Sequence, residues 1–395
     1  SLEENFIRLS NRSSLLLPKI FPIGDIENND PEFGNLETII HRNLPRAISP
    51  IRRQLLLAKL IKAWSINNTK ISVEKTSTWS IENVMRLADE LTKLIDSAEI
   101  EEVSFSKLKD LAPHEFAHHW QNTIRFLDIV TNAWPDILSE EGLIDTVTRR
   151  NLAIHHICDF WEKSKPQNPI IIAGSTGSIP AVARLMKTVS YLPNGMILLP
   201  GLDKELSSNN WESITPSHPQ FTLKTLLKRL SIKRSNVKTW PTALCFNHNS
   251  SRSKMLSEAL KPPKTNNAIP NFQLDHDAIK NITIVECADT REEAGLIALR
   301  MRAALDEIST SGNKAKSGRL KNRRLKTIAL ITADRQLAHQ VAVELTKWNI
   351  TVDDSAGKPI NQTLEGSLLQ LTSKFFIKDL GTVDLLAALK HPLAS

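Results

Sequence analysis

The sequence predicts a mixed α/β protein with two α/β units, the first of which is interrupted by a helical block. A β-branched run at 170–173 ends at the glycine turn 174–177 and leads directly into helical spacing of apolar residues over 179–190. Strand and helix patterns alternate again after residue 278, whereas residues 36–165 are helical in pattern. Alternation of this kind indicates a parallel sheet in each unit.

The chain opens with the pattern of a helix end, followed by a strand over 14–25. Because no initiator methionine and no strand precede that helix, we expect the chain to begin inside a domain. Ser80 stands at an expected helix start. Apolar residues recur at helical spacing over 54–64, 80–95 and 116–129, which predicts an all-helical unit of about four to five helices within 36–165.

Beyond the helical block, a second short buried strand is expected within 195–203, parallel to the first. Residues 261–277 are rich in proline and asparagine and predict a linker. Strands and helices then alternate over 282–286, 291–308, 327–332, 335–348 and 350–352. After Pro359 the pattern is helical again, and we expect both ends of the chain to be truncation points.

The turn between the first buried strand and its helix is the most informative chemical feature. A strand that ends in glycines before a helix start presents backbone N–H groups to phosphate. A true phosphate loop also needs a lysine for the β- and γ-phosphates, and no lysine follows Gly177. We therefore expect a degenerate nucleotide loop, formed by Gly174, Ser175, Thr176, Gly177 and Ser178. The alternative is an autonomous ATPase or phosphotransfer enzyme that uses this turn.

Composition sets broad limits on the class of protein. The 395 residues are 41% hydrophobic and 24% charged, a globular composition. Three dispersed cysteines, Cys158, Cys245 and Cys287, predict free buried thiols in a reducing compartment, with neither a zinc ribbon nor an iron–sulfur cluster. No apolar run reaches the length of a membrane span, so we expect a cytoplasmic protein. We also expect no cofactor.

The formal net charge of +7 permits a polyanion as partner. A basic run within 314–326 lies among Ser, Gly and Asn; a solvated loop is the main interpretation, with phosphate contact as the alternative. A second run, 224–238, is expected to be helix-like and is the better DNA candidate, because an ordered element presents its charges at fixed spacing. The candidate DNA-binding residues from both runs are Lys224, Lys228, Arg229, Lys233, Arg234, Arg323 and Arg324.

Three further motifs resemble functional sites, but simpler structural roles account for them better. His114–His118 spells H-E-x-x-H, but no third ligand stands at a familiar spacing, so no metal site is expected. Asp203 follows the second strand, where a turn or N-cap role outweighs metal binding. Ser217–Gln220 precedes a helix and is expected to cap it or to contact another part of a complex.

Several segments along the chain carry a resemblance to a known family. They lie in collinear order: 15–20, 22–25, 117–120, 133–138, 149–151, 173–180, 199–203, 217–220, 352–357 and 391–392. On these residues the chain resembles the AddB subunits of AddAB helicase–nucleases, in their alphaproteobacterial form. In the second α/β unit, 288–294 and 328–332 also resemble superfamily 1 helicases of the UvrD/PcrA type.

The resemblance implies two degenerate RecA-like units of superfamily 1 helicase type. Its domains would be 1–35 with 166–260 (1A-like), the insertion 36–165 (1B-like), the linker 261–277, 278–362 (2A-like), and the start of a further insertion at 363–395 (2B-like). The chain would lack the family's N-terminal start and its C-terminal nuclease domain. It would contribute to double-strand break repair by homologous recombination, guiding or recognising single-stranded DNA and docking an AddA-type motor subunit. No ATPase or nuclease centre is expected within it.

Overall fold

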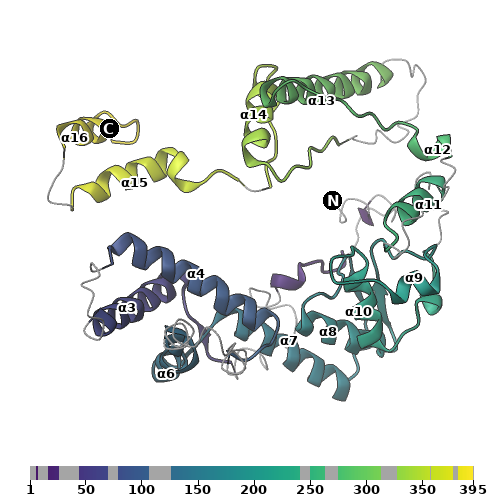
Figure 1. Cartoon of the computed structure of the whole chain (residues 1–395), viewed down its shortest axis with the longest axis horizontal. Coiled ribbons are helices and arrows are strands. Elements are labelled where there is room, and N and C mark those ends of the chain that lie inside the picture. The colour runs from purple at the N-terminus through teal and green to yellow at the C-terminus, as the bar shows by residue number, and fades with distance from the viewer. Residues whose placement is uncertain are drawn as a thin grey trace, which may run out of the picture. The chain divides into compact units, whose positions relative to one another are not determined.

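The computed structural model has a mixed α/β fold, as the sequence predicts. The chain divides into two compact units, Ser1–Lys280 and Asn281–Ser395, whose elements are labelled in Figure 1. The structure describes residues 6–7, 17–25, 44–69, 79–105, 126–240, 250–262, 275–312, 327–355, 357–376 and 381–394.

The helical block of the first unit is built on two long antiparallel partners, α3 (Pro50–Thr69) and α4 (Ile81–Ile100). Ser80 is the N-cap of α4, and its hydroxyl accepts from the Asn83 amide at 3.3 Å, so the predicted helix start is confirmed. After the π-helical turn η5 (Ile129–Ala133) come α6 (Trp134–Glu141) and α7 (Thr146–Lys163). Residues at helical spacing bury the shared core: Leu57, Ile61, Val84, Ala88, Leu91 and Ile95.

Two short strands show that the all-helical prediction for 36–165 is wrong in part. β1 (Arg46–Ala47) pairs in parallel with β2 (Leu143–Ile144), and the Ile48 amide donates to the Ile144 carbonyl at 2.9 Å. Each strand is only two residues long, so no alternating pattern exists from which it could be predicted. The pairing is a tertiary contact that ties the entry of α3 to the entry of α7.

A buried ionic cluster joins α3, α4 and α7. The Arg53 guanidinium lies 2.5 Å from Asp96 (Nη1 to Oδ1) and 2.8 Å from Asp145 (Nε to Oδ1), the second contact being too poorly aligned for a hydrogen bond. The Trp134 indole donates to the other Asp145 oxygen at 2.7 Å. Arg53 and Asp145 are only 5% and 2% exposed. Their removal from water is costly unless these contacts hold.

A third carboxyl, that of Glu99, completes the cluster. The pKa of Glu99 is raised to about 7, chiefly by burial and secondly by the charge of Asp145, against a hydrogen bond with Thr148 that lowers it. Burial also raises the pKa of Asp145, although Arg53 and Trp134 oppose that rise. Three carboxyls around one guanidinium therefore hold a proton close to neutral pH.

This proton makes the stability of the helical block depend on pH. A folded pKa above the unfolded value of 4.5 means that the folded state binds the extra proton, so stability falls as pH rises from about 4.5 to about 7. Allowing for partial solvent exposure, Glu99 should account for about 1–2 kcal/mol of that loss. In Glu99→Gln this loss should disappear, which urea unfolding at pH 5 and pH 8 would measure. The exposed Glu140→Gln is the control, and equal pH dependence in Glu99→Gln and the parent would contradict the prediction.

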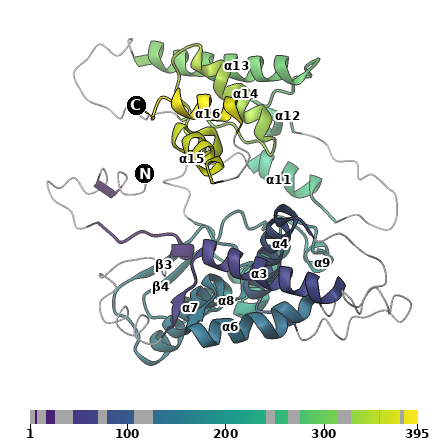
Figure 2. The same cartoon turned by 90° about the vertical axis from the view of Figure 1, so that its left-hand side faces the viewer.

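The α/β part of the first unit is a two-stranded parallel sheet covered by helices. β3 (Ile170–Ala173) pairs with β4 (Gly195–Leu198), in the register Ile170 to Gly195. α8 (Pro180–Ser190) connects them and packs against both strands, as Figure 2 shows. The strand at 170–173 and the helix at 179–190 are thus confirmed within a residue.

The prediction that these strands are buried holds for only one face of the sheet among the described residues. Ile172 is buried against α8, but Ile171 on β3 and Met196 on β4 are 57% and 43% exposed. Alternate residues of a strand point to opposite faces, so one face of the sheet is packed and the other lacks a cover among the described residues. The strands are apolar on both faces, which led to the prediction of burial. An apolar sequence does not reveal whether another part of the chain packs on the second face.

The rest of the first unit is helical. α9 (Ser208–Glu212) and α10 (Phe221–Leu230) follow β4, and η6 (Arg234–Asn236) comes next. α11 (Ser250–Ala259) packs against α12 (His276–Ile279), where Arg252 Nε donates to the Ala278 carbonyl at 2.9 Å. The C-terminal end of the predicted linker 261–277 therefore begins a short helix, with Asp275 as its N-cap.

The second unit has a helical core made by α13 (Thr290–Gly312) and α14 (Arg335–Thr346). Its buried residues are Ala294, Ala298, Leu337, Val341 and Leu345. The short η8 (Ile360–Gln362) leads to α15 (Leu364–Lys374) and α16 (Thr382–Leu389), so the predicted return to helix after Pro359 is confirmed.

The predicted strands 282–286, 327–332 and 350–352 form no ladder among the described residues of this unit. Their apolar residues lack a second packing surface: Ile284 is 89% and Ile331 is 95% exposed. A strand needs a hydrogen-bonded neighbour as well as an apolar sequence, and the sequence pattern indicates only the apolar character.

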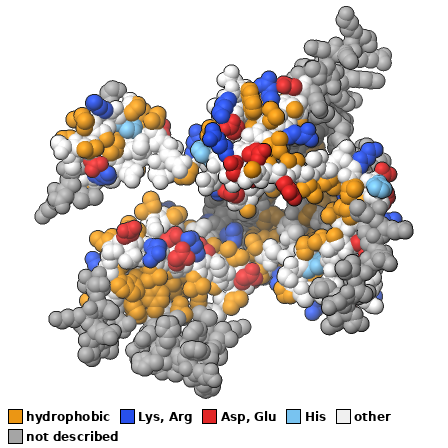
Figure 3. Space-filling model, turned by 45° about the horizontal axis from the view of Figure 1, so that its top comes forward, with side chains coloured by type: hydrophobic (Ala, Val, Ile, Leu, Met, Phe, Trp, Pro, Cys, Tyr) orange, Lys and Arg blue, Asp and Glu red, His pale blue; other side chains and the backbone are white. Residues whose placement is uncertain are grey.

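Hydrophobic side chains also gather on the surface of the helical block of the first unit, as the space-filling view shows (Figure 3).

Candidate phosphate turn and basic surfaces

The turn after β3 has two glycines at positive φ before a helix start. Gly174 and Gly177 take φ values of +77° and +60°, which side-chain-bearing residues rarely adopt. Pro180 occupies the first turn of α8, and Ile179 at the N-cap provides no side-chain hydrogen bond to the first amides. The Ser175 hydroxyl accepts from the Gly177 amide at 3.2 Å, so one N–H of the turn already has an internal partner.

Packing explains why Gly177 is a glycine. A Cβ atom there would lie 2.6 Å from Leu226 Cδ1 on α10 and 3.2 Å from Met186 Sδ on α8. Gly177 is buried, whereas nothing lies within 4 Å of a Cβ placed on Gly174. The turn is therefore seated on the apolar face of α10, which gives the second glycine a structural role besides any phosphate contact.

The two glycines give a matched pair of substitutions. Gly177→Ala should cost about 2–3 kcal/mol, because backbone strain and overpacking against Leu226 add. Gly174→Ala should cost only the strain, about 1 kcal/mol. Thermal unfolding of both variants measures the difference, and equal losses would show that Leu226 moves aside without penalty.

A cavity of about 350 Å³ lies beside the turn and is lined by Gly174, Ser175, Ile179 and the segment Phe21–Gly24. Arg150 of α7 reaches its wall, and the Arg150 Nη2 atom is buried without a hydrogen-bond partner among the described residues. Sequence reasoning missed this residue as a site component, since Arg150 entered only through the family resemblance of 149–151. An unpaired guanidinium nitrogen near a helix start is suited to an anion.

Two of the candidate DNA-binding cations already make structural contacts within the chain. Lys224 is held by α9, with Nζ donating to the Glu212 carbonyl at 2.6 Å. Arg234 donates to the Leu206 carbonyl at 2.6 Å, and its guanidinium carbon lies 4.7 Å above the Trp211 ring. Both are structural cations. Arg323 and Arg324, like the rest of the basic run 314–326, lie outside the described residues.

Three of the candidates remain exposed, and their side chains have no partner among the described residues: Lys228, Arg229 and Lys233. The expectation of one helix-like run over 224–238 is wrong. α10 ends at Leu230, Ser231 takes a left-handed conformation (φ 57°), and the Ile232 amide turns back to the Leu227 carbonyl at 3.0 Å. Lys233 and Arg234 consequently leave the helix axis, and only Lys228 and Arg229 present charges from the helix itself.

The turn role of Asp203 is confirmed, whereas Gln220, the N-cap of α10, makes no side-chain capping hydrogen bond. Asp203 Oδ1 accepts from the amides of Glu205 and Leu206 at 2.8 and 3.0 Å, which is a turn role. Gln220 joins this turn to the start of α10: its Oε1 accepts from the Asp203 amide and its Nε2 donates to the Gly201 carbonyl. His218 Nε2 contacts the Leu260 carbonyl at 2.6 Å, so the contacts of Ser217–Gln220 join segments of the same unit, and contact with another part of a complex stays a prediction.

The H-E-x-x-H segment at 114–118 lies outside the described residues, and the described part of the chain holds no cluster of three metal-binding side chains. Cys158 is buried and free, and burial raises the pKa of its thiol. Cys287 is free and half-buried, while Cys245 lies outside the description. None of the helices in the described ranges has the length and apolar character to cross a membrane.

Searches against protein-family models, curated proteins and solved structures find no match to this chain. The interpretation of the site therefore depends on the residues of the chain itself.

Proposed function

We propose that this chain is the helicase-like part of an AddB-type subunit of a helicase–nuclease. Its role would be to guide single-stranded DNA and to dock an AddA-type motor subunit during the resection of double-strand breaks. In this proposal the β3–α8–β4 unit and the α13–α14 unit are degenerate RecA-like lobes.

The turn after β3 carries this proposal. It keeps two glycines at positive φ before a helix start, yet it contains no lysine, and Gly177 is fixed against Leu226. Without the lysine that reaches the β- and γ-phosphates, such a turn supports the fold of a nucleotide-binding lobe rather than hydrolysis. The exposed Lys228, Arg229 and Lys233, beside this turn through α10, supply cations for a DNA backbone.

One observation favours a second candidate, the phosphate chemistry of an autonomous enzyme. Arg150, whose buried Nη2 has no hydrogen-bond partner in the described part of the chain, lines the same cavity as Gly174 and Ser175. If this guanidinium replaces the missing lysine, the chain should bind ATP, and Arg150→Gln should abolish that binding. ATP turnover by the purified chain that is lost in Arg150→Gln would replace the proposed function by this one.

The proposed function is tested by DNA binding and by assembly. The chain should bind single-stranded DNA without hydrolysing ATP and should co-purify with an AddA-type motor subunit. Lys228→Ser with Arg229→Ser should weaken DNA binding and reduce the log–log salt slope by about 1.4, since each phosphate contact on a single strand contributes about 0.7. Lys59→Ser with Lys62→Ser, which removes the same charge from α3, is the matched control. Absence of both DNA binding and motor binding would reject the proposal.

A further inference from the structure

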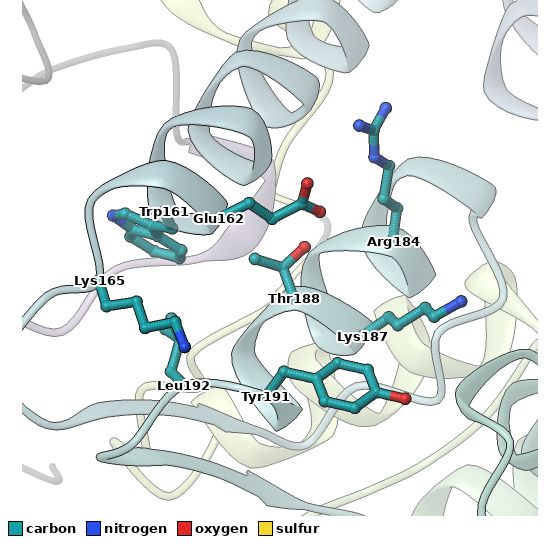
Figure 4. Close-up of a pocket in the computed structure, with 8 residues that line it drawn as sticks. All are labelled: Trp161, Glu162, Lys165, Arg184, Lys187, Thr188, Tyr191 and Leu192. Carbon is teal, nitrogen blue, oxygen red and sulfur yellow. The ribbon is translucent and has the colours of Figure 1, made fainter.

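A second cavity, of about 510 Å³, lies between the C-terminal end of α7 and the outer face of α8 (Figure 4). Trp161 and Lys165 line it from the α7 side. From α8 and its C-cap come Arg184, Lys187 and Tyr191, which stand at helical spacing on one face. The volume falls within the usual range of roughly 300–1,000 Å³ for a small-ligand site.

The charges of this cavity are only partly neutralised from within. Arg184 pairs with Asp159 at 2.5 Å and also contacts His155, whose other ring nitrogen lies 2.6 Å from Glu102. Lys165 and Lys187, in contrast, are exposed and form no ion pair within the described part of the chain. In the close-up the Glu162 carboxylate points towards the Arg184 side, away from Lys165 (Figure 4). Two ammonium groups are therefore available to an anionic ligand.

The base and the rim of the cavity differ in exposure. Trp161 and Leu192 are each 8% exposed and form an apolar base, whereas Tyr191 is 67% exposed. A large aromatic ring held on a helix C-cap, with most of its surface in water, is a stacking surface without a partner in the described residues. Aromatic rings beside cations are the chemistry by which proteins hold single-stranded nucleic acids: bases stack on the rings, and phosphates meet the cations.

We infer that this cavity is a binding subsite for a nucleotide unit of single-stranded DNA, with a base on Tyr191 and flanking phosphates at Lys165 and Lys187. The inference rests on the proposed function for the identity of the strand. It goes further in assigning a contact surface on α7 and α8, separate from the glycine turn and from the cations of α10.

The sequence offers a direct probe, because Tyr191 is the one tyrosine of the chain. Biosynthetic labelling with fluorotyrosine gives one fluorine NMR resonance, located at this cavity. Titration with an oligothymidylate should shift the resonance until it saturates. In Lys165→Ser with Lys187→Ser the shift should need a roughly three- to tenfold higher DNA concentration.

Affinity measurements separate stacking from charge. Tyr191→Ala should weaken binding roughly fivefold or more, because base stacking on an aromatic ring is lost, while Tyr191→Phe should bind like the parent. The charge control is again Lys59→Ser with Lys62→Ser, which should leave the fluorine shift intact. Competition by a matching oligoribonucleotide would show whether the site prefers DNA, and tighter binding of RNA would overturn the assignment to DNA.

The possible failures can be distinguished. A parent chain that binds no single-stranded DNA rejects the proposed function and this subsite with it. If the parent binds DNA while its fluorine resonance stays fixed, and Tyr191→Ala keeps the same affinity, the subsite alone is overturned. The cations of α10 would then remain the proposed DNA contact.

Discussion

Replacing Arg53 by methionine is expected to destabilise the helical block by about 3–5 kcal/mol, since removal of the cation leaves the buried carboxylate of Asp145 and the half-buried one of Asp96 without compensation. The guanidinium lies within 2.8 Å of both Asp96 and Asp145, and Asp145 is only 2% exposed. Methionine fills a similar volume, so the loss would come from charge rather than from a cavity. Urea unfolding followed by circular dichroism at pH 8 measures it.

The neighbouring Arg52 provides the control for this substitution. Its side chain is 58% exposed and pairs with Glu141 at 2.9 Å, so Arg52→Met should cost less than about 1 kcal/mol. The loss in Arg53→Met should also shrink at pH 5, where the carboxyls left without their cation can take up protons. A loss that is equal in the two variants, or independent of pH, would show that Arg53 acts through packing.

Gly195→Ala should be the most damaging small substitution in the α/β part, at about 3 kcal/mol, the upper end of overpacking costs. A Cβ atom there would lie 1.9 Å from the Val189 carbonyl oxygen, which already accepts a hydrogen bond from the Leu192 amide. That oxygen belongs to the backbone and cannot rotate away as a side chain could. The turn from α8 into β4 would have to open, and the pairing of Gly195 with Ile170 would be lost.

Thermal unfolding of Gly195→Ala should therefore show a large fall in midpoint. Gly295→Ala is a control of opposite sign: this glycine lies inside α13, nothing lies within 4 Å of its added Cβ, and alanine favours the helix by up to about 1 kcal/mol. A Gly195→Ala variant as stable as the parent would mean that the α8–β4 turn has freedom which its hydrogen bonds do not indicate.

The sequence was sufficient where a local pattern and its packing surface coincide. The strand at 170–173, the helix at 179–190 and the N-cap at Ser80 all follow from spacing and capping chemistry that act within a few residues. The turn role of Asp203 is of the same kind, because an aspartate accepts from amides two and three residues ahead.

The sequence was insufficient where the outcome depends on a distant partner. The segments 282–286 and 327–332 have strand composition, but no strand partner forms in the described residues. In the sequence, Arg234 and Lys228 are both cations of one basic run. In the structure, the chain turns at the left-handed Ser231, Arg234 packs on Trp211, and Lys228 stays exposed to solvent. The cavity at Tyr191 escaped prediction because its walls come from two helices separated by the β3 turn.

The two-stranded sheet β3–β4 has a consequence for the way this part of the molecule opens. A pair of strands is at best marginally stable on its own, and here one face carries exposed Ile171 and Met196. The amide protons of the strands are therefore protected from exchange with solvent only while α8 stays docked. Hydrogen–deuterium exchange should find β3, β4 and α8 opening together as one cooperative unit, with a common protection factor and no independent fraying of the strands.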